Sequence, residues 1–293
     1  MNNQLRGKRL LILGGTQISC EIVRAAQKYG ITAIVADYYT EKDSPAKRIA
    51  NEHYQVSVTN VDDVTALIQK KNIDGVITGF SDMLLPYYAE ICMKSGLPCY
   101  ASKEQFDIFI NKDRYKKLCR EFGVPTVEEY MIDEKNWTNS SQHLKYPVLV
   151  KPADSSGARG VYVCHNEEEL RQSYQLAKTH SKSGTILIER YLTGREVTVF
   201  WVFQEGRYHV AMIGNRHVKN NQTGVIPLPV GYTFPASVTE SYLQDIAPKV
   251  KRMFRSIGLK NGIMFMQCKV EDSEVIVYDI GYRLTGSLEY KIL

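Results

Sequence analysis

The most informative stretch of this sequence is YPVLVKPADSSGARG (146–160). An apolar strand delivers Lys151 near its end and continues at once into a loop of small residues. Glycine lets a backbone approach phosphate oxygens closely, and exposed N–H groups in such a loop form an anion-binding concavity. Lys151 would add a point charge for phosphate, and an ammonium inside an apolar strand is unfavourable without a partner. The stretch is therefore consistent with a phosphate-binding loop, and an ordinary Gly/Ser loop after a strand is the alternative.

The residues around this stretch predict a mixed α and β region. The stretch 111–123 has the pattern of a helix and is followed by a GVP turn, and 167–181 has the pattern of a second helix. Apolar runs predict strands on both sides of the loop; after it they cover 161–164, 185–192, 196–203, 207–214, 258–270 and 274–283.

The first hundred residues alternate between strand and helix patterns. KRLLILG (8–14), TAIVAD (32–37) and DGVITGF (74–80) read as strands, and helical patterns at 20–30 and 62–72 separate them. This alternation predicts a parallel sheet covered by helices, with ligands at the carboxyl ends of its strands. The turn GGTQIS after the first strand lacks the third glycine of a dinucleotide fingerprint, which argues against an NAD-binding oxidoreductase.

The region from about residue 105 onward resembles the ATP-grasp family, and the arrangement is similar to carbamoyl-phosphate synthase large-subunit halves, biotin carboxylase and D-alanine–D-alanine ligase. Lys112 lies 11 residues before the glycine of the GVP turn, where the family places a phosphate-binding lysine. Lys151 opens a Gly-rich flap, as the second family lysine does, and ERYL (189–192) is similar to an adenine-binding linker.

The resemblance implies a nucleotide site. Lys112, Lys151 and Arg159 would neutralise the phosphates, and Glu196, seven residues after the first glutamate of the linker, would bind the ribose hydroxyls. The remaining residues that the resemblance assigns to ATP are those of the flap and of the linker: Ser155, Ser156, Gly157, Gly160, Glu189, Arg190 and Leu192.

The resemblance also implies a Mg²⁺ or Mn²⁺ site at Gln267 and Asp279, twelve residues apart. Arg283 is expected to bind the acyl phosphate, and structural pairing with a carboxylate is the alternative. Since side chains at i and i+4 of a strand share a face, Asp279 and Arg283 are expected to point into one site. The chain departs from the family at two positions. Asp279 replaces the usual glutamate, and Gly281 replaces the usual asparagine, which removes a ligand and puts the second metal ion in doubt.

These features imply an ATP-dependent ligase that forms an acyl phosphate from a carboxylate and couples it to an amine. The expected organisation is a Rossmann-like pre-ATP-grasp domain (1–104), an ATP-grasp N-terminal subdomain with the flap (105–185) and a C-terminal subdomain (186–293). Relatives commonly continue past this end, so either the chain is truncated, the fold closes with a shorter tail, or a partner supplies the rest. The alternative is a degenerate member that binds nucleotide for regulation or assembly, without catalysis.

Composition limits the partners. The 293 residues are 44% hydrophobic and 24% charged, and 37 basic and 32 acidic residues give a net charge of +5. The basic residues are spread along the chain, which does not favour nucleic-acid binding. No window is apolar enough to span a bilayer, and the six cysteines show no metal-binding spacing. We expect a cytoplasmic enzyme of small-molecule substrates, with a homodimer as the commonest assembly.

Overall fold

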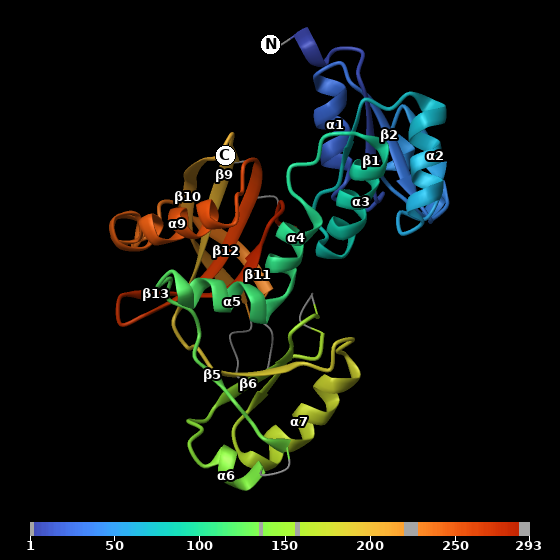
Figure 1. The fold of residues 1–293 in the computed structure, drawn as a ribbon. Coiled ribbons are helices and arrows are strands. Elements are labelled where there is room, and N and C mark those ends of the chain that lie inside the picture. Colours follow the sequence, from blue (N-terminus) through green and yellow to red (C-terminus); the bar gives the residue numbers. More distant parts are fainter. Residues whose placement is uncertain (1–2, 135–136, 156–158, 220–227, 287–293) are drawn as a thin grey trace. The chain divides into compact units, whose positions relative to one another are not determined.

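The computed structural model describes residues 3–134, 137–155, 159–219 and 228–286 (Figure 1). The chain divides into two compact units. Met1–Asp107 forms the first unit together with Lys260–Gly262 and the segment from Arg283. Ile108–Leu259 and Ile263–Tyr282 form the second. The predicted subdivision at residue 185 stays a prediction.

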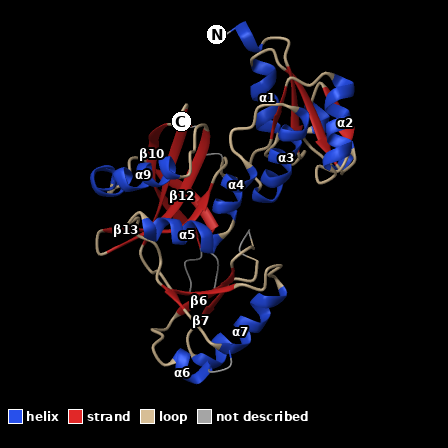
Figure 2. Cartoon of the chain, in the orientation of Figure 1, coloured by secondary structure: helices blue, strands red, loops and turns tan. Residues whose placement is uncertain are grey.

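The first unit is built on a parallel sheet of strand order β3-β2-β1-β4, with α1 on one side and α2 on the other (Figure 2). Leu11, Ile34 and Val35 are fully buried, because this sheet carries helices and its strands are apolar on both faces. The elements are η1 (Asn3–Leu5), β1 (Arg9–Leu13), α1 (Cys20–Lys28), β2 (Thr32–Asp37), η2 (Glu41–Asp43), η3 (Lys47–Ile49), β3 (Glu52–Gln55), α2 (Val61–Lys71), β4 (Gly75–Ile77), η4 (Asp82–Leu84), α3 (Leu85–Ser95) and α4 (Lys103–Ile110).

The second unit contains two sheets. The smaller has the order β5-β8-β6-β7 with antiparallel pairs, and α7 packs on it through Leu170, Tyr174 and Ala177. Its elements, with the helix α5 that precedes them, are α5 (Lys112–Glu121), β5 (Glu129–Tyr130), α6 (Trp137–Ser141), β6 (Val148–Pro152), β7 (Tyr162–Cys164), α7 (Glu167–Thr179) and β8 (Ile186–Arg190).

The larger sheet has the order β11-β10-β9-β12-β13. Its back face packs on α9, where Trp201 meets Phe254 edge to face with ring centroids 5.3 Å apart. Alternation along β9 then leaves Glu196 and Thr198 on the opposite, front face. The elements are β9 (Arg195–Gln204), β10 (Arg207–Lys219), β11 (Leu228–Thr233), α8 (Thr239–Ser241), the π-helical turn η6 (Tyr242–Ile246), α9 (Ala247–Ser256), β12 (Gly262–Glu271) and β13 (Glu274–Gly281).

The predicted mixed fold, with a parallel sheet first and antiparallel sheets after it, is confirmed. In the part of the chain that the structure describes, no helix is both long and apolar enough to cross a membrane.

Candidate active site

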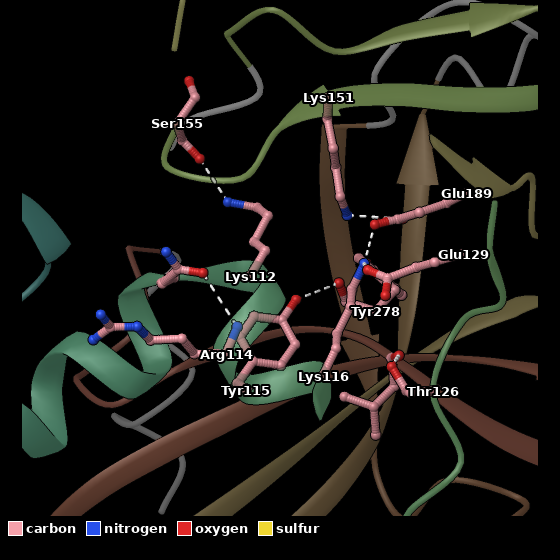
Figure 3. Close-up of polar contacts among 12 residues, drawn as sticks. Lys112, Arg114, Tyr115, Lys116, Thr126, Glu129, Lys151, Ser155, Glu189 and Tyr278 are labelled. Carbon is pink, nitrogen blue, oxygen red and sulfur yellow. Dashed lines mark hydrogen bonds and ion pairs between the residues drawn. The ribbon is translucent and has the colours of Figure 1, made fainter. Parts of the chain in front are cut away.

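Lys151 lies in β6 and is only 5% exposed. Its ammonium nitrogen is 2.9 Å from Oε2 of Glu189, which comes from the neighbouring strand β8 (Figure 3). A buried charge needs a partner of opposite sign, and the carboxylate of Glu189 is that partner for the ammonium of Lys151. It also means that the carboxylate of Glu189, 1% exposed, is already occupied within the protein.

A second lysine, which the sequence did not single out, completes this cluster. Lys116 is fully buried, and its ammonium binds Oε1 of Glu189 and, at 3.0 Å, Oε1 of Glu129. Glu129 in turn accepts a hydrogen bond from Arg120 at 2.6 Å. In sequence, Lys116 looks like any other charged residue of an amphipathic helix, and only its place four residues after Lys112 puts both on one helix face.

The charges in this cluster shift one another's protonation. Burial alone would raise the pKa of Glu189, but the ammonium groups of Lys151 and Lys116 outweigh burial and hold that pKa below its ordinary value. Burial lowers the pKa of Lys116, and the charge of Lys151 lowers it further, while Glu189 and Glu129 act in the opposite direction. The carboxylate is therefore ionised and shared between two cations.

Lys112 begins α5 and reaches the loop after β6. Its ammonium donates to the carbonyl oxygen of Ser155 at 2.5 Å, and its backbone N–H donates to the carbonyl of Ala153 at 3.1 Å (Figure 3). Asn111 caps the helix by accepting the N–H of Arg114 at 3.2 Å. Lys112 is thus brought to the loop that directly follows the strand of Lys151.

The loop itself is described only in part. Ser156 and Gly157, both predicted to contact ATP, lie outside the described residues. The hydroxyl of Ser155 donates to the carbonyl of Arg159 at 2.9 Å, and the side chain of Arg159 is exposed. Gly160 has φ of +73°, and a Cβ atom there would lie 2.9 Å from Cβ of His180, so this position favours glycine on both counts.

The front face of the larger sheet carries a second charged cluster. Glu196 pairs with Arg216 of the adjacent strand β10, and its other oxygen lies 3.9 Å from Lys269 on β12. Sequence reasoning found Glu196 but not its two cations. Within the described residues, Nε of Arg216 and Oγ1 of Thr198 are buried without a hydrogen-bond partner. Unpartnered buried donors on a charged face fit a polar, anionic ligand.

The linker after β8 is fixed through Glu271 at the end of β12. Glu271 accepts hydrogen bonds from the Arg190 guanidinium at 2.6 Å and from the N–H groups of Thr193 at 2.6 Å and Gly194 at 3.1 Å. The N–H of Arg190 donates to the carbonyl of Glu128 at 3.0 Å, so this donor is already used. Leu192 is buried with Val127 and Ile276.

The predicted metal ligands face each other across two strands. Gln267 of β12 is the register partner of Asp279 of β13, which places two oxygen-bearing side chains side by side. Among the described residues, no group of three or more His, Cys, Asp or Glu side chains is placed to hold a metal. A Cβ atom at Gly281 would overlap the ring of Phe265. The residues therefore fit one Mg²⁺ completed by phosphate oxygens and water, and they do not fit a second.

Arg283 is paired with a carboxylate, which is the alternative role expected for it. Strand β13 ends at Gly281, so strand alternation no longer relates Arg283 to Asp279. Its guanidinium instead donates two hydrogen bonds of 2.6 Å to the carboxylate of Asp82, and both residues belong to the first unit. A contact of Arg283 with acyl phosphate stays a prediction.

The turn after β1 in the first unit is held by internal bonds. Asp37 accepts the N–H of Gly15 at 2.5 Å and that of Tyr39 at 2.9 Å. A side chain at position 15 would overlap the hydroxyl of Ser44. Since the carboxylate of Asp37 is used in shaping the turn, these residues favour a structural role over a dinucleotide site.

Comparison with known proteins identifies the fold. Residues 144–289 match the family model described as an ATP-grasp domain. The chain is 31% identical over 201 residues to the formate-dependent phosphoribosylglycinamide formyltransferase of Sulfurisphaera tokodaii, a match that covers 66% of this chain and 49% of the relative. It spans about half the length of that protein.

Two solved structures have the same fold. Biotin carboxylase of Campylobacter jejuni, in complex with β-γ-ATP, superposes with a TM-score of 0.80 at 19% identity over 98% of this chain and 67% of its own. The N5-carboxyaminoimidazole synthetase of Staphylococcus aureus, complexed with ADP, gives a TM-score of 0.78 at 20% identity over 100% of this chain and 74% of its own. The match over residues 144–289 shows an ATP-grasp domain in this chain.

Proposed function

We propose that this chain binds Mg–ATP in its second unit and transfers the γ-phosphoryl group to a substrate carboxylate. This transfer releases ADP, and an amine then attacks the acyl phosphate, which gives an amide and releases phosphate. The observation that carries the proposal is that Lys112, at the start of α5, contacts the loop that directly follows β6, the strand that carries the buried Lys151. The ATP-grasp match over the same region supports it.

The residues have distinct parts in this proposal. Lys112, Lys151 and Arg159 neutralise the phosphates, because phosphoryl transfer needs positioning and charge stabilisation more than covalent help from the protein. Ser155 and Gly160 shape the loop over them. Glu196 accepts hydrogen bonds from the ribose hydroxyls.

The adenine is held by the backbone of the linker that includes Arg190 and Leu192. The side chain of Glu189 is not available for this contact, because both its oxygens bind lysines.

When bound, Mg²⁺ or Mn²⁺ would neutralise charge on the phosphate oxygens, and Gln267 and Asp279 would hold it. The acyl phosphate must be kept from water, which would otherwise hydrolyse it.

The substrates are a small-molecule carboxylate and a small-molecule amine. Neither nucleic acid nor a membrane has a part in this proposal. The proposal places the protein in the cytoplasm as a homodimer, which cell fractionation and light scattering would test.

The experiment is ADP release from ATP against panels of carboxylates and amines, for wild type, Lys151→Ala and the exposed-lysine control Lys251→Ala. We expect release that needs both a carboxylate and an amine, falls at least ~100-fold in Lys151→Ala because a charge that stabilises the transferring group is lost, and is retained in the control. Release that is equal in all three proteins would contradict the proposal.

The overlap at Phe265 and Gly281 favours one second candidate, a family member that binds nucleotide without transferring phosphate. Such a protein would bind Mg–ATP and release no ADP with any substrate pair. The same assay separates the two functions.

A further inference from the structure

We propose that Lys116 is a positioning residue for Lys151, acting through the carboxylate that the two lysines share. This role rests on the proposed function of Lys151 as a phosphate-binding lysine. Lys116 would hold Glu189 by one oxygen, so that Lys151 is able to leave the other oxygen and meet the phosphates of ATP.

The geometry assigns one oxygen of Glu189 to each lysine. Lys116 binds Oε1 and Lys151 lies 2.9 Å from Oε2 (Figure 3). Both ammonium groups and the carboxylate are nearly or fully buried, with 0% of Lys116, 5% of Lys151 and 1% of Glu189 exposed. In such surroundings, an ionised group left without its partner is strongly destabilised.

Lys116 itself is held from the far side. Glu129 accepts from Lys116 at 3.0 Å with one oxygen and from Arg120 at 2.6 Å with the other. From Arg120, whose side chain is 46% exposed, the charges therefore alternate in sign through Glu129, Lys116 and Glu189 to Lys151. Three cations and two carboxylates leave this row with one net positive charge.

The helix that carries Lys116 is anchored on the larger sheet. The hydroxyl of Tyr115 donates to the carbonyl of Tyr278 on β13 at 2.8 Å (Figure 3). Lys112 and Lys116, one helical turn apart, therefore face the loop and the smaller sheet from a fixed support.

The consequence for ATP follows from charge pairing. With Lys116 present, Glu189 keeps one cationic partner when Lys151 turns to phosphate. Without Lys116, Lys151 is the only cation on a buried carboxylate, and its departure would leave that carboxylate unpaired. The phosphates of ATP and the carboxylate of Glu189 would then compete for the ammonium of Lys151.

The test compares Mg–ATP affinity by calorimetry in wild type, Lys116→Met and Lys117→Met. Lys117 is the exposed neighbour of Lys116 on the same helix and serves as the matched control. We expect Lys116→Met to weaken binding by about tenfold to a hundredfold, the loss typical of one charged hydrogen bond. Lys117→Met should bind as the wild type does.

Two further readouts separate positioning from mere structural support. Glu189→Gln added to Lys116→Met removes the competing carboxylate, so the double variant should bind Mg–ATP more tightly than Lys116→Met alone. In Lys116→Met, one of the two cations that hold down the pKa of Glu189 is lost, so that pKa should rise. The affinity difference between Lys116→Met and the control Lys117→Met should then become smaller as the pH is lowered. If Lys116 has only a structural role, the double variant should bind Mg–ATP more weakly than Lys116→Met does. The affinity difference between Lys116→Met and Lys117→Met should then not change with pH.

The outcomes are distinguishable. Two results would overturn the role of Lys116 and leave the proposed function standing. One is that Lys116→Met binds Mg–ATP as tightly as the wild type does, and the other is that the double variant binds it no more tightly than Lys116→Met. If the single variant fails to fold, the double variant still decides, because it removes both charges of the Lys116–Glu189 pair and leaves Lys151 available to phosphate: binding near the wild-type level supports the role, and a folded double variant that has lost binding overturns it. Absence of Mg–ATP binding in the wild type would remove the proposed function and this role together.

Discussion

The ring of Phe265 occupies the space that a side chain at position 281 would need. Phe265 and Gly281 are register partners on β12 and β13, and a Cβ atom at 281 would overlap the ring. At position 281, similar proteins are expected to carry a metal-binding asparagine. This chain therefore lacks both that ligand and the space for its side chain. That space is filled by an aromatic side chain two residues from Gln267, on the same face of the sheet.

Gly281→Asn alone should not restore a second metal ion. The added side chain has no room beside Phe265, and overpacking of this kind typically costs ~1–3 kcal/mol of folding free energy. Chemical denaturation would measure that loss. Electron paramagnetic resonance with Mn²⁺ and ATP should show one bound ion in wild type and in Gly281→Asn, and a second ion only when Phe265→Ala is combined with Gly281→Asn. Two coupled ions in the wild type would refute the single-ion site.

Asp279→Asn should weaken Mg–ATP much more than it weakens ATP measured in EDTA. The reason is that a carboxylate ligand contributes to metal binding and the neutral amide does so poorly. Asp272→Asn, in an exposed turn before β13, is the matched control. Equal effects of Asp279→Asn with and without the metal would show that Asp279 supports the sheet and not the ion.

Glu196→Gln should reduce discrimination between ATP and 2′-deoxy-ATP. In the proposed site the carboxylate accepts hydrogen bonds from ribose hydroxyls, and each charged hydrogen bond contributes about 1.5–3 kcal/mol. The wild type should therefore prefer ATP by about tenfold or more, and the variant should bind both nucleotides with similar weakened affinity. A preference that survives in Glu196→Gln would place the ribose elsewhere.

Stability at acidic pH should depend on Glu271. Burial alone would raise the pKa of Glu271, but hydrogen bonds from Arg190, Thr193 and Gly194 outweigh burial and hold that pKa below its ordinary value. A lowered folded-state pKa means that the ionised carboxylate stabilises the fold above the ordinary glutamate pKa, and that this contribution is lost as the pH falls through the lowered value.

Urea unfolding of wild type and Glu271→Gln tests this. The wild type should be more stable at pH 7, and the difference should shrink below pH ~4.3, where the unfolded carboxylate starts to bind a proton. A difference that stays constant down to pH ~3 would mean that packing, and not charge, is what the variant loses.

Much of the fold was predictable because burial leaves a clear pattern in apolar strands. RLLIL, TAIVAD and VLVKP are buried in the structure, and each was expected as a strand within two residues of its observed ends. Helix α9 was not expected, because APKVKRMFRS is rich in charge. Its apolar face of Val250, Met253 and Phe254 is recognised only when the sheet against which it is buried is known.

The site was predictable where a charge stands in an apolar run, as Lys151 does. Lys116 and Lys117 are indistinguishable in sequence, yet one is fully buried and the other exposed, since only the tertiary placement of Glu129 and Glu189 separates them. Arg216 was missed for the same reason. Its partner Glu196 is on a different strand, and cross-strand pairing depends on register, which local patterns do not fix.

The central claim is that Lys151 is part of a Mg–ATP site, and the most direct measurement is the thermal midpoint with and without Mg–ATP in wild type and Lys151→Ala. A ligand at ~100-fold over its dissociation constant adds ~2.7 kcal/mol of stability, and for a chain of this size each kcal/mol raises the midpoint by ~2–4 °C. The account predicts a rise of several degrees in the wild type that largely disappears in Lys151→Ala. No rise in the wild type, or an equal rise in both proteins, would contradict it.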